Sequence, residues 1–122
     1  MSIEDVVAEY SAAWSETDPA ARLAMLERTV VTDVPYVDPG AQVVGVAALS
    51  EVIAGVQEQL PGAVLLRTSA IDQHHDVVRF SWVFVDPAGA PLLEGIDVCR
   101  VADDGRIASF TVFFGPLAEE PA

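Results

Sequence analysis

The sequence predicts a single α+β domain over residues 1–122, in which three helices come first and a curved, mostly antiparallel sheet follows. In the first half of the chain, apolar residues repeat with the 3.6-residue period of amphipathic helices. In the second half, β-rich runs alternate with turn residues and no helical period remains. A curved sheet needs helices to cover one of its faces, and a sheet wrapped around helices leaves an apolar pocket.

The first two helices are marked by the residues at their N-termini. Ser2 is a suitable cap for the first helix, with Asp5 three residues later as its partner. Asp18 is a suitable cap for the second, short helix, and Pro19 fits its first position. The apolar face of the first helix consists of Ile3, Val6, Val7, Tyr10 and Trp14.

A strand, a turn and a third helix are expected next. Residues 29–37 are rich in β-branched side chains and predict a strand, which Pro35 confines to an edge or an irregular position. The sequence Asp38-Pro39-Gly40 is a turn signal that ends this strand. After Gly45 the helical period returns, and Pro61-Gly62 ends the third helix.

The remaining chain predicts four consecutive antiparallel strands from Ala63 onward. Turn residues separate these strands at 73–76, at 86–89 and at 103–105. Residues 115–122 contain two prolines and two glutamates and predict a tail that frays at its end.

The charge of the chain excludes several functions. The sequence contains 19 acidic residues, six arginines and no lysine, and its formal net charge is −13. Nucleic acids and anionic membrane surfaces repel such a protein. The lack of lysine excludes Schiff-base catalysis and the phosphate-binding lysine of a P-loop. No apolar run approaches the roughly 18 residues of a membrane span.

Cysteine usage and the N-terminal residues predict a cytoplasmic protein. The single cysteine, Cys99, can form neither an intrachain disulfide nor a thiolate zinc cluster. Residues 1–5 are acidic where a signal or transit peptide is basic. The adjacent His74 and His75 point to opposite faces of a strand, so we expect no metal site there.

Asp97 is a polar residue on an apolar strand face. In the strand from Leu92 to Val101, Asp97 shares its face with Gly95 and Cys99, whereas Arg100 points to the other face. A desolvated carboxyl has a raised pKa and can stay neutral, which turns it into a hydrogen-bond donor. The alternatives are that Asp97 pairs with Arg67 or Arg79, or that its face is hydrated.

Tyr10 and Asp38 are the other candidates for polar site residues. Tyr10 lies on the apolar face of the first helix, where its hydroxyl needs a partner if it is buried. It can also be an ordinary core tyrosine bonded to a backbone carbonyl. Asp38 stands at a strand end before a proline, where loops at a pocket rim often carry function. Its alternative role is that of a plain turn residue.

An aromatic stripe and a histidine complete the candidate pocket. Phe80, Trp82 and Phe84 alternate along one strand and suit either the pocket wall or a face that a second subunit covers. If no bulge intervenes, His74 shares the parity of this stripe and can reach the pocket, whereas His75 has the opposite parity.

Several short motifs resemble the nuclear-transport-factor-2-like superfamily, in particular its SnoaL-like and ketosteroid-isomerase-like members. They are Ala8-Glu9-Tyr10, Tyr36-Val37-Asp38-Pro39-Gly40 with Gly45 opening a helix, Gly95-Ile96-Asp97-Val98 and Asp104-Gly105-Arg106-Ile107. The resemblance covers nearly the whole chain and implies a cone-shaped, cystatin-like α+β fold that encloses an apolar pocket.

The resemblance also implies roles for individual residues. Asp38 is the expected general base, and Tyr10 with a neutral Asp97 is the expected oxyanion hole for an enolate. Trp14 can take the place of Tyr10. Besides Trp14, the residues expected to contact the ligand are Trp82, His74, Phe110, Val112 and Phe114.

The expected function is binding of a small apolar or polycyclic carbonyl compound, with cofactor-free isomerisation or aldol-type ring closure through its enolate. A homodimer formed through the sheet is expected. The main alternative is a non-catalytic ligand-binding or dimeric interaction module of the same fold. An epoxide hydrolase of this fold needs an Asp-Arg-Asp cluster, which the outward parity of Arg100 opposes.

Overall fold

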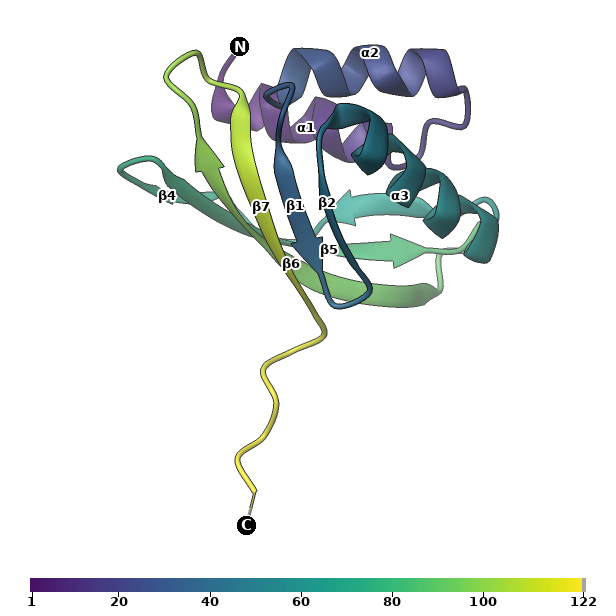
Figure 1. The fold of residues 1–122 in the computed structure, drawn as a ribbon. Helices are drawn as coiled ribbons and strands as arrows, with labels where there is room; N and C mark the ends of the chain where they lie inside the picture. The colour runs from purple at the N-terminus through teal and green to yellow at the C-terminus, as the bar shows by residue number, and fades with distance from the viewer. Residues whose placement is uncertain (122) are drawn as a thin grey trace.

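Three helices cover one face of a single curved sheet in the computed structural model, which describes residues 1–121 (Figure 1). This arrangement confirms the predicted α+β class. The helices are α1 (Ile3–Ala13), α2 (Pro19–Thr29) and α3 (Val46–Gln59). The strands are β1 (Pro35–Asp38), β2 (Ala41–Val44), β3 (Val64–Arg67), β4 (Asp72–His74), β5 (Val77–Val85), β6 (Pro91–Val101) and β7 (Ile107–Phe114).

The predicted helix caps are confirmed. The Ser2 hydroxyl accepts the backbone N–H of Asp5, and the Asp5 carboxylate accepts the backbone N–H of Ser2, both at 3.1 Å. This reciprocal pair satisfies two of the free N–H groups at the start of α1. The Asp18 carboxylate accepts the N–H of Ala21, also at 3.1 Å, at the start of α2. Gly45 precedes α3 as its N-cap residue, with φ of +100°, a conformation that favours glycine.

The sheet is mixed and has seven strands. Its order is β2-β1-β7-β6-β5-β3, and β4 pairs with β5. All pairs are antiparallel except β1 with β7, where Tyr36 lies opposite Phe110. This parallel pair joins the first β-hairpin to the last strand. It therefore brings Asp38, at the end of β1, to the same sheet as the long strands β5 and β6.

The predicted strand over residues 29–37 is mostly wrong. Thr29 ends α2, Val30 forms only an isolated bridge with Ile107, and the regular strand begins at Pro35. Val34 donates its N–H to the carbonyl of Val31 in a turn, so this β-branched segment packs into the core without extending. Strand β1 lies between β2 and β7, with Pro35 as its first residue, which is a position that proline tolerates.

Two further strand predictions need correction. The four-residue strand β2 was not predicted, because only a short segment separates the turn at Asp38 from Gly45. The first of the four expected antiparallel strands is divided into β3 and β4, both of which pair with β5. Four residues, 68–71, lie outside regular structure between them.

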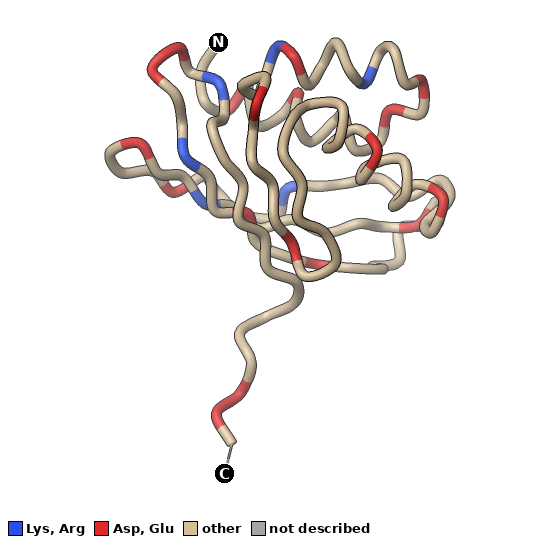
Figure 2. The backbone as a smooth tube through the Cα atoms, viewed as in Figure 1, with Lys and Arg blue, Asp and Glu red and all other residues tan. Residues whose placement is uncertain are grey.

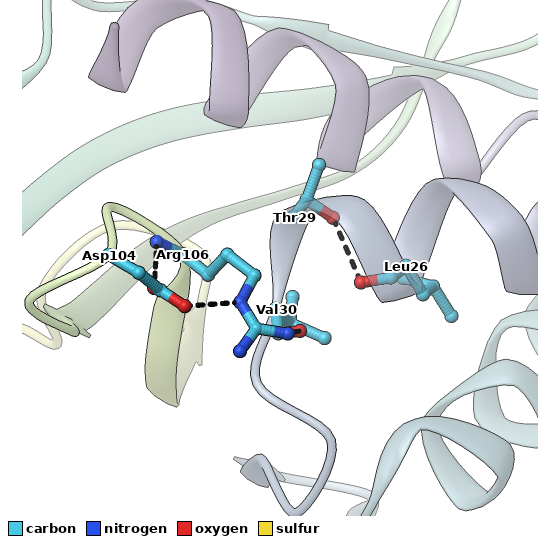
Figure 3. A network of polar contacts seen from close by, with 5 residues as sticks. All are labelled: Leu26, Thr29, Val30, Asp104 and Arg106. Carbon is cyan, nitrogen blue, oxygen red and sulfur yellow. Dashed lines mark hydrogen bonds and ion pairs between the residues drawn. The ribbon is translucent and has the colours of Figure 1, made fainter. Parts of the chain in front are cut away.

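A polar network joins the end of α2 to the turn between β6 and β7 (Figure 3). Arg106 donates to the Asp104 carboxylate at 2.8 Å and to the carbonyl of Val30 at 3.4 Å. The hydroxyl of Thr29 donates to helix carbonyls, including that of Leu26 at 3.4 Å. These bonds satisfy backbone groups where the helix ends and fix the crossing from α2 to the sheet.

The surface is acidic, and the chain ends in an extended segment. Figure 2 shows acidic residues on the helices, in the loops between strands and on the C-terminal segment. Residues 115–121 have no helix or strand and lead away from the sheet (Figure 1); Ala122 of the predicted tail lies outside the described residues. None of the helices among residues 1–121 is long and apolar enough to cross a membrane.

Truncation of a core residue of α3 tests the packing of the helices on the sheet. Leu49 is fully buried, so Leu49→Ala is expected to lower the free energy of unfolding by about 2–5 kcal/mol. Val44 on β2 is 67% exposed, and Val44→Ala serves as the control with a change of about 0.5 kcal/mol or less. Urea denaturation measures both; a loss below about 1 kcal/mol for Leu49→Ala contradicts the packing described.

Candidate functional site

A narrow cavity lies between the helices and the concave face of the sheet. Its volume is about 30 Å³, which is room for roughly two water molecules. Pockets for drug-sized ligands measure about 300–1,000 Å³, so a larger ligand enters only if wall residues move. The cavity is lined by Tyr10, Trp14, Tyr36, Asp38, Val56, Leu65, Trp82, Phe84, Leu93, Asp97, Val112 and Phe114.

Asp97 is buried in the cavity wall and is 5% exposed. It sits on the inner face of β6 with Gly95 and Cys99, as its parity predicts. The pKa of Asp97 is raised to about 7. Burial is the largest cause because it penalises the carboxylate; the hydrogen bond from Trp82 opposes the shift, and the charge of the nearby Asp38 adds to it. The Trp82 indole N–H donates to Asp97 Oδ1 at 2.7 Å. Near neutral pH this carboxyl can therefore be a hydrogen-bond donor.

No arginine neutralises Asp97 within residues 1–121. Arg67 donates to the carbonyl of Ser69, and Arg79 pairs with Asp72 at 2.9 Å on the surface. The alternative pairing of Asp97 with either arginine is therefore wrong. Arg100 pairs with Asp76 at 3.0 Å on the other side of the sheet, so an Asp-Arg-Asp cluster is not formed in the cavity.

Asp38 lies at the end of β1, partly buried in the same cavity wall. The Tyr36 hydroxyl donates to Asp38 Oδ2 at 2.7 Å, and the backbone N–H of Gly40 donates to Oδ1 at 2.7 Å. Tyr36 and Asp38 are two residues apart on a strand and so share a face. Burial and the adjacent Asp38 raise the pKa of Tyr36, so this phenol keeps its proton and holds the carboxylate in place.

Tyr10 and Trp14, the two candidates for the same role, both line the cavity. Tyr10 is 1% exposed, and its ring stacks on Phe110 with centroids 4.4 Å apart. Burial raises the pKa of Tyr10 well above its usual value, and the charge of Asp97 adds to this effect. Tyr10 therefore stays protonated and able to donate a hydrogen bond.

A buried polar clamp holds Trp14 at the cavity. Gln57 of α3 donates to the carbonyls of Trp14 at 3.1 Å and Glu16 at 2.8 Å. Arg22 of α2, which is 4% exposed, donates in turn to Gln57, Glu16 and Ser50. The three helices are thus bonded together where α1 ends, which holds the backbone at Trp14 in place.

The other predicted ligand contacts are divided between the cavity and its surroundings. Trp82, Val112 and Phe114 line the cavity, whereas Phe110 packs behind Tyr10. His74 lies at the exposed end of β4 and does not reach the cavity. The parity argument for His74 fails because a turn at His75, with φ of +51°, separates β4 from β5.

Four cavity residues are not among the sequence candidates. Tyr36 belongs to the motif around Asp38, and its spacing of two from Asp38 is a usable signal. Phe84 of the aromatic stripe lines the cavity. Val56, Leu65 and Leu93 are apolar residues on a helix and two strands, and their inward orientation depends on how the sheet curves.

Comparison with known proteins identifies a family. The sequence pattern of the SnoaL-like domain matches residues 7–110 of this chain. No protein with a curated description is similar in sequence to the chain.

Solved structures share the fold. A candidate isomerase of the SnoaL-like family from Agrobacterium tumefaciens superposes with a TM-score of 0.86 at 27% identity, covering 93% of this chain and 97% of that protein. An NTF2-like protein of unknown function from an Exiguobacterium species has a TM-score of 0.68 at 16% identity, covering 93% and 99%. A protein with a ketosteroid isomerase-like fold from Catenulispora acidiphila, in complex with trimethylamine, has a TM-score of 0.69 at 20% identity, covering 91% and 84%.

The raised pKa of Asp97 predicts a pH dependence of stability. The folded chain binds the Asp97 proton more tightly than the unfolded chain does. Protonation of Asp97 therefore stabilises the fold fully below about pH 4, and this stabilisation is lost as the pH rises to about 7. Between pH 4.5 and 7.5, the free energy of unfolding of Asp97→Asn is expected to fall by about 3 kcal/mol less than that of the wild type. Urea denaturation across this pH range measures it.

Asp103→Asn is the matched control for this measurement. Asp103 is exposed on the turn between β6 and β7, so its replacement removes one acidic charge without changing the cavity. Its stability should follow the wild-type pH curve. Parallel pH curves for Asp97→Asn and Asp103→Asn contradict a raised Asp97 pKa.

Proposed function

Because this chain belongs to the SnoaL-like domain family, we propose that its cavity binds a small carbonyl compound and transfers a proton next to the carbonyl group without a cofactor. The observation that carries the proposal is the buried Asp97, which shares one cavity with Asp38 and Tyr10. This set combines one partly buried carboxylate with two groups that can donate hydrogen bonds. An enolate-forming reaction needs such a combination of base and donors.

The proposed reaction begins with the substrate oxygen near Asp97 and Tyr10. The Asp38 carboxylate removes a proton from the carbon next to the carbonyl, and the electrons of the broken C–H bond move to the carbonyl oxygen. The neutral Asp97 carboxyl and the Tyr10 hydroxyl donate hydrogen bonds to the resulting enolate. In an isomerisation, Asp38 returns its proton to another carbon. In a ring closure, the enolate carbon attacks a second carbonyl, the electron pair of that C=O bond moves to its oxygen, and this oxygen takes the proton back from Asp38.

The cavity walls support a neutral, apolar substrate. Apart from Asp38 and Asp97, its lining consists of aromatic and aliphatic residues. An anionic substrate would therefore meet like charge, and no arginine among the described residues lines the cavity to offset it. The small volume admits the reacting carbonyl end first. A polycyclic body requires movement of side chains such as Phe114, which is 39% exposed at the cavity.

The second candidate function is ligand binding without catalysis. The observation that favours it is the cavity volume of about 30 Å³, which leaves little room for a substrate in a reactive pose. In that case the same aromatic walls bind a small apolar molecule. The two functions differ in whether Asp38 exchanges protons with the ligand.

A cytoplasmic location accompanies this proposal. Cys99 is a buried, free cysteine, which is compatible with a reducing compartment. The acidic surface suits a protein that stays in solution at high concentration.

A homodimer through the outer face of the sheet is also part of the proposal. The face opposite the helices carries an apolar outer patch, which crosses from β3 through β5 and β6 to β7. In this patch Phe113 is 61% exposed and Leu66 is 47% exposed. Leu66 lies opposite Val83, and Ile96 lies opposite Phe113, while Ser81 and Glu94 stand between these two apolar pairs in the β5–β6 register. Exposed apolar patches with a polar surround mark interaction surfaces, and a second copy of the chain is the occupant that fits an identical patch.

Hydrogen–deuterium exchange of a simple ketone tests the proposed proton transfer. Wild-type protein in D2O is expected to speed the exchange of the α-protons of cyclopentanone above the buffer rate, as followed by NMR. Asp38→Asn should lower this acceleration by about 100-fold or more, because it removes the base. Tyr10→Phe should lower it by about 100-fold through the loss of one donor to the enolate.

Asp103→Asn is the control and should exchange cyclopentanone at the wild-type rate, since Asp103 is exposed and remote from the cavity. Exchange at the buffer rate in the wild type, together with saturable binding of cyclopentanone, supports the non-catalytic alternative. Full activity in Asp38→Asn overturns the assignment of the base.

Sedimentation velocity tests the proposed dimer. Phe113→Glu places a charge in the outer patch and is expected to convert the dimer to a monomer. Val44→Glu is the control, because Val44 is 67% exposed on β2, away from this patch, and it should leave the dimer intact. A wild-type chain that sediments as a monomer at micromolar concentration contradicts the proposal.

A further inference from the structure

Trp82, which lines the cavity, faces Gly95 on the neighbouring strand. They are opposite partners in the antiparallel pair of β5 and β6. A Cβ atom at Gly95 would overlap Cζ2 of the Trp82 indole, and it would lie 2.5 Å from the carbonyl oxygen of Phe113. The indole therefore occupies the space in which any other residue at position 95 would place its side chain.

This position of the ring allows the indole N–H to reach Asp97. In the β5–β6 register Asp97 lies opposite Phe80, so it is the diagonal neighbour of Trp82 on the same face. The indole crosses β6 from Gly95 toward Asp97, and its Nε1 lies 2.7 Å from Asp97 Oδ1. The hydrogen bond therefore requires that the Trp82 indole lie close against the backbone of Gly95.

The hydrogen bond makes the two oxygens of Asp97 unequal. An indole N–H can only donate, so Oδ1 is an acceptor toward Trp82 whether or not the carboxyl is protonated. Within residues 1–121, Oδ2 has no such partner, and no fully buried side-chain oxygen lacks a hydrogen bond. Oδ2 is therefore the oxygen that contacts the cavity space, because Asp97 lines the cavity.

We propose that Gly95 and Trp82 are positioning residues that direct the Asp97 acid proton into the cavity. With Oδ1 occupied by the indole N–H, the proton of the neutral carboxyl resides on Oδ2 and points at the bound ligand. Glycine at position 95 keeps the ring flat across β6, and the ring fixes the carboxyl. This role rests on the proposed function only in that the ligand presents an oxygen to Asp97.

A purely structural role for Trp82 is the competing explanation. The indole packs edge-on against Phe84, with centroids 5.5 Å apart, and against Phe114, with centroids 6.1 Å apart. Loss of this packing alone would lower the melting temperature and leave the titration of Asp97 unchanged. The test therefore measures the Asp97 titration directly, by carboxyl-carbon NMR, and needs no substrate.

Trp82→Phe keeps an aromatic ring and removes the N–H. Because the hydrogen bond favours the ionised carboxyl, its loss is expected to raise the pKa of Asp97 by about 1–2 pH units. Trp14→Phe is the matched control. Trp14 is the other tryptophan that lines the cavity, and in the described chain it makes no hydrogen bond to Asp97. The Asp97 titration should therefore be the same in Trp14→Phe as in the wild type. An unchanged Asp97 titration in folded Trp82→Phe overturns the proposal.

Gly95→Ala tests whether Gly95 positions the Trp82 indole. The methyl group displaces the indole, so the pKa of Asp97 should rise as in Trp82→Phe. In wild type, the indole N–H signal of Trp82 should shift as Asp97 titrates, and in Gly95→Ala this coupling should be lost. If Gly95→Ala does not fold, the Asp97 titration in Trp82→Phe and the indole signal of the wild type still test the proposal.

The outcomes separate this inference from the proposed catalysis. A raised Asp97 pKa in Trp82→Phe, with a wild type that does not exchange cyclopentanone, retains the positioning role and removes the enolate mechanism. Exchange activity in the wild type with an indole signal that is insensitive to Asp97 retains the mechanism and overturns the positioning role.

Discussion

The site depends on a carboxyl that the strand period places on the apolar face of a curved sheet. Asp97 is 5% exposed on the inner face of β6, and the only hydrogen bond that its carboxyl receives in the described chain comes from an indole N–H. Burial of a charged carboxylate costs free energy, so the protonated form is favoured. The same packing of helices on the sheet that stabilises the domain therefore sets the chemistry of this residue.

The sheet topology supplies the second carboxyl in a different environment. The parallel pairing of β1 with β7 brings Asp38 to the rim of the cavity, where Tyr36 and the backbone of Gly40 each donate a hydrogen bond to it. Asp38 thus receives two donors and is partly exposed, whereas Asp97 receives one donor and is buried. Two carboxyls in one cavity with opposite environments suit the opposite roles of base and acid.

The sequence predicts features that depend on local spacing. The caps at Ser2 and Asp18, the glycine start of α3 and the inward orientation of Asp97 follow from turn chemistry and from the strand period of two, and the structure confirms them. Features that depend on pairing between distant segments were missed. The strand β2, the parallel β1–β7 pair and the division of β3 from β4 all follow from which strand lies beside which. The position of His74 was missed for the same reason, because parity does not continue across a turn.

The most direct test of the account is the titration of Asp97 in the wild-type protein, followed by its carboxyl-carbon chemical shift, with Asp97→Asn used to assign the signal. A buried Asp97 with the geometry described should titrate near pH 7. Its signal should therefore still be that of the protonated acid at pH 5. Titration of Asp97 near pH 4 would contradict a desolvated carboxyl in the cavity wall, and with it the proposed donor to an enolate.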